Sequence, residues 1–245
     1  MTKQQHYSYD TTMSISVVLP AYNEEDNIYE SVIKSVNFLQ QIAHNFEVIV
    51  VNDGSTDQTL DSFKKAQTLF PNHIKIINHP KNLGYGAALR NGFLTAKGDY
   101  IFYTDSDNQF DIRELRDFLP HMKTHDMVVG FRIYRYDTVL RCLLSWIYNR
   151  LISILFKINI RDVDCAFKLF KKEIFNHLII QSNNFFVDAE IVGKARKLGF
   201  SIYQRGVRHY PRLHGTTTVR PSDIPRTLRE MAKLYIQIRK IKKIQ

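Results

Sequence analysis

An Asp-x-Asp cluster is the pattern in this chain with the clearest chemical capacity. Asp105 and Asp107 directly follow the apolar run at 99–104, and Gln109 comes two residues later. Two carboxylates at this spacing in a loop can reach one hard divalent cation, Mg²⁺ or Mn²⁺, and the amide oxygen of Gln109 can add a ligand. Such cations commonly bridge phosphates at nucleotide sites, so the cluster predicts a site for a metal and a diphosphate.

Two further polar clusters also follow apolar runs. Residues 22–24 (Tyr-Asn-Glu) come after the run at 14–20, and residues 53–55 (Asp-Gly-Ser) come after the run at 46–51. Each cluster alone is typical of an ordinary turn. In an open parallel sheet, however, ligands bind at the carboxyl ends of the strands, so three such clusters predict one shared site.

The elements that must position these clusters alternate between strand and helix. Apolar runs rich in β-branched residues predict strands at 14–20, 46–51, 74–77, 99–104 and 127–130. Apolar residues at helical spacing predict helices that begin near Asn23, after Asp57 and at Gly84. Short connections between alternating strands and helices predict an α/β fold with a mainly parallel central sheet.

The composition is that of a globular protein. The 245 residues include 44% hydrophobic and 24% charged residues, which excludes a disordered or fibrous chain. Cys142 and Cys165 cannot form a disulfide framework, so a reducing, cytoplasmic location is expected. No run of about 18 uncharged apolar residues predicts a spanning helix, and the first dozen residues lack the apolar run of a secretory signal.

The net charge of +10 is unevenly distributed. Residues 226–245 carry seven cations and one acid, which accounts for six of the ten excess positive charges. No helix-turn-helix, zinc-finger or aromatic RNA-binding signature accompanies this charge, so nucleic acid is not an expected partner. A basic tail is instead typical of a solvated or membrane-facing segment.

Two segments have the amphipathic pattern of interfacial helices. The segment 140–159 is widely apolar, with one narrow polar stripe at every fourth residue, and it contains Trp146 and Tyr148. This pattern favours a helix in a membrane interface, with a core or dimer helix as the alternative. Residues 224–244 place apolar side chains at helical spacing among cations, which is typical of a helix that attracts anionic headgroups. We therefore divide the chain into a polar tail (1–13), a main domain (14–220) and a basic amphipathic helix (221–245).

Seven motifs resemble those of a known family. The chain resembles family 2 glycosyltransferases in four motifs: VVLPAYNEEDNI (17–28), VVNDGSTDQT (50–59), NLGYGAALRNGF (82–93) and GDYIFYTDSDNQFD (98–111). It resembles the dolichol- or polyprenyl-phosphate sugar transferases within that family in three more motifs: VVGFR (128–132), DVDCAFKLFKKEIF (162–175) and FVDAEIVGKARKLGF (186–200). The resemblance covers residues 14–220 and implies the GT-A fold, a Rossmann-like, nucleotide-sugar-binding α/β architecture, here with amphipathic membrane-facing helices added.

The resemblance also implies roles for matching residues. In the donor site it implies that Asp53 hydrogen-bonds the base, that Ser106 lies beside the ribose or diphosphate, and that Gly84, Gly86 and Ala87 let the backbone approach the nucleotide. The remaining residues that it places around the nucleotide are Pro20, Tyr22 and Glu24. The metal ligands that it implies are Asp105, Asp107 and Gln109.

Further matches concern phosphate and sugar. The resemblance implies that Arg132 handles the acceptor phosphate, that Glu190 lies near the sugar, and that Arg212 contacts the diphosphate. Thr218 stands where the family often has a lysine, so the loop-closing contact there is open. The residues implied as catalytic are Asp107, Arg132 and Glu190.

For several of these residues a structural alternative is open. Arg132 can pair with a surface acid, and Glu190 can be a helix-surface residue. Asp164 is an extra acid or a turn cap. Asp162 and Lys168 match charged positions of the subgroup and are expected to support the site.

The sequence therefore predicts a metal-dependent, inverting transferase that moves a hexose from a nucleotide sugar of the GDP-mannose or UDP-glucose type to a polyprenyl or dolichyl phosphate. Its expected location is peripheral, at the cytosolic face of a membrane, where the expected partner is an anionic lipid surface, with a membrane protein as a further candidate. A family 2 enzyme with a soluble or cell-surface glycan acceptor is the main alternative. A non-catalytic binding module and a nucleotidyltransferase are weaker ones, because the Asp-x-Asp cluster is intact and no glycine-rich loop follows Pro20. The sugar and the base stay open.

Overall fold

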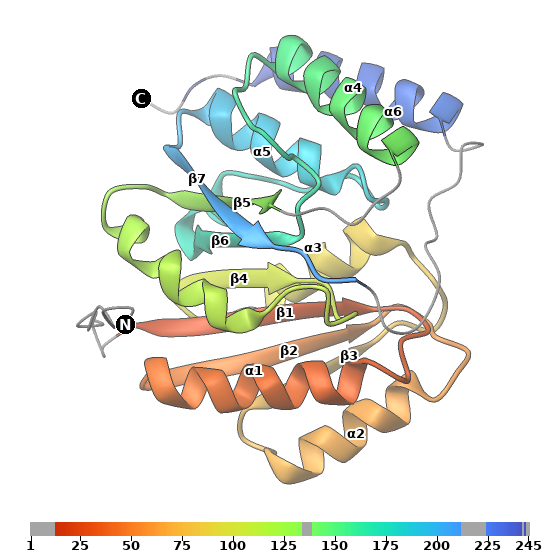
Figure 1. Cartoon of the computed structure of the whole chain (residues 1–245), viewed down its shortest axis with the longest axis vertical. Helices are drawn as coiled ribbons and strands as arrows, with labels where there is room; N and C mark the ends of the chain where they lie inside the picture. Colours follow the sequence, from red (N-terminus) through yellow and green to blue (C-terminus); the bar gives the residue numbers. More distant parts are fainter. Residues whose placement is uncertain (1–12, 134–138, 212–223, 242, 244–245) are drawn as a thin grey trace.

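Seven strands form one sheet at the centre of the molecule (Figure 1). The computed structural model describes residues 13–133, 139–211, 224–241 and 243. The strand order is β3-β2-β1-β4-β6-β5-β7. Every strand pair is parallel except the two made by β6, which runs antiparallel to β4 and β5. The predicted, mainly parallel sheet is confirmed. The strands are β1 (Ser14–Ala21), β2 (Asn45–Asn52), β3 (Ile74–Asn78), β4 (Tyr100–Thr104), β5 (Met127–Ile133), β6 (Phe167–Lys171) and β7 (Ile202–Arg208).

Helices cover both faces of this sheet. The helices α1 (Ile28–Ile42) and α2 (Thr59–Leu69) pack on one face, with the short 3₁₀ segments η1 (Ile112–Asp117) and η2 (Leu119–Lys123). The opposite face is covered by α3 (Tyr85–Thr95), α4 (Val139–Phe156), α5 (Val187–Leu198) and α6 (Ile224–Lys240), while η3 (Lys172–Asn176) follows β6. The first helix begins at Ile28, later than predicted, because residues 23–27 form a turn.

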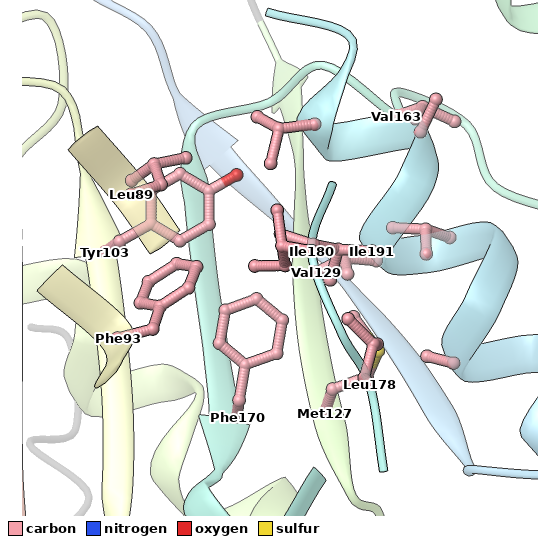
Figure 2. Packing of buried hydrophobic residues seen from close by; sticks show 14 of the residues in the cluster. Leu89, Phe93, Tyr103, Met127, Val129, Val163, Phe170, Leu178, Ile180 and Ile191 are labelled. Atoms are coloured by element: carbon pink, nitrogen blue, oxygen red, sulfur yellow. The ribbon is translucent and has the colours of Figure 1, made fainter. Parts of the chain in front are cut away.

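The alternation of side chains along each strand divides the core into two clusters. On β4, Phe102 faces α1, whereas Ile101 and Tyr103 face α3 and α5. Figure 2 shows Tyr103 beside Phe93 and Phe170, and the ring centroids of Phe93 and Phe170 are 5.8 Å apart in an edge-to-face arrangement. Because both faces of the central strands β1, β2 and β4 are buried, their sequences are predominantly apolar, which is typical of a parallel sheet.

The two amphipathic segments both form helices, and they lie side by side (Figure 1). The apolar face of α6 packs on the protein itself, where Met231, Leu234 and Ile238 are buried in the cluster that includes α4 and α5. This corrects the expectation that this face is turned to lipid. It also makes α6 part of the main hydrophobic core, although it lies beyond the boundary predicted at 220.

Helix α4 is apolar on two sides: Ile152 and Phe156 are buried in the core cluster, whereas other apolar side chains are exposed. Asn149, in its polar stripe, is buried, and its Oδ1 accepts a hydrogen bond of 2.8 Å from the backbone N–H of Val163. Its exposed side chains include Trp146 at 65% and Ile154 at 61%, so α4 packs on the core by one side only. The other exposed apolar residues of α4 are Leu143, Ile147 and Leu151. Among the described residues, no helix has the length and apolar character needed to cross a bilayer.

Candidate active site

The three polar clusters predicted to share a site emerge at one edge of the sheet. Ala21 at the end of β1 pairs with Asn52 at the end of β2, and β4 lies on the other side of β1. The first two loops are joined by hydrogen bonds from Asn23 N–H to Ser55 Oγ (3.0 Å) and from Thr56 N–H to Asn23 Oδ1 (2.9 Å). Asn23 adopts a positive φ of 55°, a conformation that asparagine tolerates better than most residues. The loops are therefore fixed against each other.

The Asp-x-Asp loop has a donor set that fits a divalent cation. Asp105 accepts a hydrogen bond of 2.8 Å from the Tyr85 hydroxyl, and Asp107 Oδ1 accepts one of 3.0 Å from Gln109 N–H. The Gln109 amide nitrogen donates to Tyr210 O at 3.0 Å, which fixes its side chain. Within the described ranges no group of three or more His, Cys, Asp and Glu side chains is arranged to hold a metal. Two carboxylates and an amide suit a Mg²⁺ or Mn²⁺ ion that takes its other ligands from water and substrate phosphates.

A cleft with a volume of about 730 Å³ begins beside this loop. Thr104, Asp105 and Asn108 line one end, and Lys34 and Phe38 of α1 line the wall. The volume lies in the range of small-ligand sites. In the described part of the chain, none of the residues predicted to surround the nucleotide lines this cleft, which meets the predicted metal ligands only at Asp105.

Several predicted nucleotide-binding residues already have protein partners. The Ser106 hydroxyl donates to the Pro20 carbonyl at 2.9 Å, which ties the metal loop to β1. The Glu24 carboxylate accepts a hydrogen bond of 2.7 Å from the Asn27 side chain. Tyr22 is exposed. Their contacts with a nucleotide stay predictions, and the structure assigns Ser106 a role in positioning Asp105 and Asp107.

Asp53 fixes the loop that precedes α3. Its Oδ1 accepts hydrogen bonds from His79 Nδ1 (2.7 Å) and Leu83 N–H (2.9 Å), and its Oδ2 accepts one from Gly84 N–H (2.8 Å). Sequence reasoning missed His79, which no motif singled out. The predicted base contact of Asp53 stays a prediction.

The glycines before and within α3 allow a close approach of protein backbone. Gly84 has a φ of 100°, and a Cβ there would lie 2.2 Å from Asn183 O. A Cβ on Gly86 would lie 2.3 Å from Ser182 O. Ala87 N–H donates to Gly84 O at 2.9 Å, and its side chain is buried. The close packing of the 182–184 loop is therefore one reason why residues 84 and 86 must be glycine.

Arg132 is paired with a buried acid, not a surface acid. Its Nε and Nη2 donate to the two oxygens of Asp162 at 2.6 and 2.7 Å. Burial lowers the pKa of Arg132, but the Asp162 carboxylate more than offsets this, so the pKa lies above its ordinary value. The expected supporting role of Asp162 is therefore to hold one edge of this guanidinium at the end of β5.

A second buried charge pair lies beneath the site. Lys168 is fully buried, and its Nζ donates to Asp188 Oδ1 at 2.5 Å, to Tyr103 Oη at 2.9 Å and to Cys165 O at 2.6 Å. Tyr103 also donates to Asp188. Tyr103 stands two residues before Asp105 on β4, so this network braces the strand that carries the metal loop.

Glu190 is buried, so the helix-surface alternative is wrong. Its carboxylate accepts hydrogen bonds from Gln181 N–H (2.9 Å), Ser182 N–H (2.7 Å) and Lys194 Nζ (2.5 Å). These contacts hold residues 181–182 against α5, and Gly86 N–H of α3 donates to Asn183 O at 2.8 Å in the same loop. Contact between Glu190 and the sugar stays a prediction.

Asp164 is a buried carboxyl that opposes folding. Burial and the charges of Asp188 and Asp162 raise its pKa to about 7, because Arg132 and Lys168 compensate for them only in part. Because the folded-state pKa is raised above the ordinary value of 3.8, stability is lost as the pH rises between these two values. Groups that cost stability in this way are typical of functional sites.

Two predicted residues, Arg212 and Thr218, lie outside the described residues. The chain passes the metal loop just before them, where Tyr210 N–H donates to Gln109 O at 2.8 Å.

Comparison with known proteins identifies the family. The sequence model described as "Glycosyl transferase family 2" matches residues 16–179. The chain belongs to this family. It is 32% identical over 211 residues to the glycosyltransferase AglD of Haloferax volcanii, across 82% of this chain and 34% of the relative. It is 32% identical over 205 residues to the dolichyl-phosphate beta-glucosyltransferase ALG5A of Trichomonas vaginalis, across 77% of this chain and 63% of the relative.

The other comparisons agree with this assignment. A dodecaprenyl-phosphate galacturonate synthase of Rhizobium johnstonii is 28% identical, across 84% of this chain and 62% of the relative. The chain thus spans between about a third and two thirds of the length of these relatives. The fold is similar to glucosyl-3-phosphoglycerate synthase of Mycobacterium tuberculosis, with a TM-score of 0.66 and 21% identity over 92% of this chain and 77% of that chain. The GT-A-type architecture expected for this family 2 chain is confirmed.

Proposed function

We propose that this chain is a glycosyltransferase that moves a hexose from a nucleotide sugar to a polyprenyl phosphate. The observation that carries the proposal is that two acids and an arginine, both suited to phosphate groups, lie at the ends of two strands close together in the sheet. Asp105 and Asp107 follow β4, and Arg132 lies near the end of β5, with only β6 between these strands. The names of the relatives that act with dolichyl or dodecaprenyl phosphate support the acceptor.

The proposed mechanism is direct displacement with inversion. Asp105, Asp107 and Gln109 would hold the Mg²⁺ or Mn²⁺ ion, which when bound stabilises the charge of the leaving nucleoside diphosphate. Crystals of the mycobacterial synthase of similar fold contain Mn²⁺ and UDP, which supports a divalent cation here. An acceptor phosphate is already anionic near neutral pH, so a strong general base is not required. Arg132, held by Asp162, would orient that phosphate toward the anomeric carbon.

We also propose that α4 lies on a membrane surface, at the cytosolic face. Its exposed apolar residues form a face without a partner in the described part of the chain, and Trp146 is typical of membrane interfaces. The exposed cations of the neighbouring α6, including Arg239 and Lys240, would attract anionic headgroups. A lipid acceptor explains why such a surface adjoins the site, and a membrane-protein partner is the competing occupant.

The transfer itself is testable with purified protein and radiolabelled nucleotide sugars. With Mg²⁺ or Mn²⁺ and polyprenyl phosphate in detergent, we expect label to move into the organic-extractable fraction for one or a few members of a UDP- and GDP-sugar panel. Label that moves only to soluble or glycan acceptors would replace the proposed acceptor. No transfer to any acceptor would contradict the proposed activity.

Membrane contact is testable by replacing Trp146 and Ile154 together with glutamate. Vesicle flotation with anionic lipids should fall by about tenfold or more, because two large apolar side chains leave the interface and two negative charges enter it. The matched control is the Leu94→Glu and Ile179→Glu pair, since these side chains are 75% and 71% exposed on other elements. Equal flotation of both double variants would overturn the assignment of α4. Deleting α6 is a poor test, because Met231, Leu234 and Ile238 belong to the core.

A further inference from the structure

We infer that Asp164 and Tyr148 together bind a hydroxyl group of the transferred sugar and so help to select which sugar is accepted. This inference rests on the proposed glycosyl transfer and deepens it. It concerns two residues to which neither the motifs nor the mechanism above assigns a role in the reaction.

The sheet topology places Asp164 beside the proposed reaction centre. In the antiparallel pair of β4 and β6, Thr104 is opposite Phe167, so the segment that precedes β6 runs beside the segment that follows β4. The same segment meets β5 on its other side, since a Cβ on Gly130 would lie 2.9 Å from Cys165 Sγ. Asp164 therefore stands between the loop with Asp105 and Asp107 and the strand that carries Arg132.

Tyr148 adjoins Asp164 from α4. Burial raises the pKa of Tyr148, and the charges of Asp164 and Asp188 together with the hydrogen-bonding interaction with Asp164 raise it further. The Tyr148 ring also lies against Phe186 at the start of α5, with ring centroids 6.4 Å apart. The two side chains thus come from different elements and meet at one place.

Among the described residues, two buried oxygens at this place lack a hydrogen bond of standard geometry. Asp164 Oδ1 and the Tyr148 hydroxyl have no hydrogen-bond partner in the part of the chain that the structure describes. Buried polar groups in folded proteins are nearly always hydrogen-bonded, so an unpaired acceptor beside an unpaired donor needs an explanation. A ligand that supplies the missing hydrogen bonds is one, and the position beside the reaction centre favours it.

The chemistry of the pair selects the class of ligand group. A hydroxyl can donate to Asp164 Oδ1 and accept from the Tyr148 hydroxyl at the same time. A phosphate would meet an uncharged phenol and the nearby acids Asp164, Asp188 and Asp162, which disfavour an anion. A neutral, hydroxyl-bearing ring is the part of the proposed donor that fits, and the phosphate groups go to the metal loop and Arg132.

The test compares Asp164→Asn and Tyr148→Phe with the wild type, using nucleotide sugars of one base that differ at single hydroxyl stereocentres. We expect each variant to lower the ratio of kcat/KM between the preferred sugar and its epimer by about tenfold or more, because a buried polar contact discriminates strongly. The Kd of the corresponding nucleoside diphosphate with Mg²⁺, measured by calorimetry, should stay within about twofold of the wild type. Tyr203→Phe, a tyrosine stacked on His121, is the matched control and should change neither value.

Several outcomes would overturn the inference. One is a selectivity ratio that is unchanged in both variants, and another is an equal loss for all sugars together with weaker diphosphate binding, which would indicate a purely structural role. The fold of Asp164→Asn is checked by its Tm, which should equal or exceed that of the wild type at pH 8, because the penalised carboxylate is gone. Tyr148→Phe tests the same site independently if Asp164→Asn fails to fold.

The experiment also separates this inference from the proposed function. If the wild type binds nucleotide sugars but transfers nothing to polyprenyl phosphate, the proposed function is wrong. The inference is then judged by binding, since each variant should reduce the affinity for the nucleotide sugar and not that for the nucleoside diphosphate. If the wild type binds no nucleotide sugar, both are wrong.

Discussion

Replacement of Asp107 by alanine is expected to lower glycosyl transfer by about 1,000-fold or more, which corresponds to about 4 kcal/mol of lost transition-state stabilisation. Asp107 is 5% exposed in the loop after β4, and with Asp105 it is one of the two carboxylates that fit the cation. Without it, the leaving nucleoside diphosphate loses its main source of charge neutralisation. The fold should tolerate the change, because a buried negative charge close to Asp105 is removed.

The measurement is the initial rate over a titration of Mn²⁺ and Mg²⁺, with thermal unfolding followed in parallel. Asp111→Asn is the matched control, since this acid lies in the same loop region, is paired with Arg113 and keeps a capping side chain after substitution. We expect the control to retain most of its turnover. A folded Asp107→Ala protein that turns over at the wild-type rate would rule out the metal loop as the centre of the reaction.

Replacement of Arg132 by alanine is expected to have two large effects. Turnover should fall by about 100- to 1,000-fold because the acceptor phosphate loses a charged, bidentate partner. The free energy of unfolding should also fall by about 3–5 kcal/mol, because Asp162 is left buried without its partner. Both salt-bridge side chains are largely buried, so solvent screens this pair little.

A double variant separates these two effects. Adding Asp162→Asn to Arg132→Ala removes the stranded charge, so most of the lost stability should return while turnover stays low. Denaturant unfolding gives the stability, and a comparison of KM for polyprenyl phosphate with kcat shows whether acceptor handling is lost. If the double variant regains wild-type turnover, Arg132 serves only to neutralise Asp162.

Local patterns in the sequence predicted the elements and the chemistry that follows them. The strands at 14–20, 46–51 and 99–104 are continuous apolar runs, and strand formation depends on such local features. Parallel strands present their carboxyl ends at one edge of the sheet, and from this rule we predicted that the clusters at 22–24, 53–55 and 105–109 lie together. The family motifs added the acids and the arginine to which we assign the reaction.

The contacts between distant segments could not be predicted in this way. Asp53 was assigned to a nucleotide base, but its oxygens accept hydrogen bonds from His79 and the backbone at 83–84. The resemblance implied that Gly84 allows a close nucleotide approach, which stays a prediction, but it did not reveal that a Cβ there would meet Asn183 O. Such pairings join residues far apart in the chain, and no local pattern contains the partner.

The sequence by itself determined the strands, the helices and the Asp-x-Asp loop to which we assign the metal, because each depends on residues close together in the chain. Only the tertiary structure decided how these parts face one another. The periodicity of α4 defined a polar stripe in a widely apolar helix, but only the tertiary structure decided that Ile152 and Phe156 are buried while Trp146 and Ile154 are exposed. The insertion of β6 between β4 and β5 likewise decided that Asp164 stands between the metal loop and Arg132. These choices depend on which surfaces bury the most apolar area together, and that is a property of the whole chain.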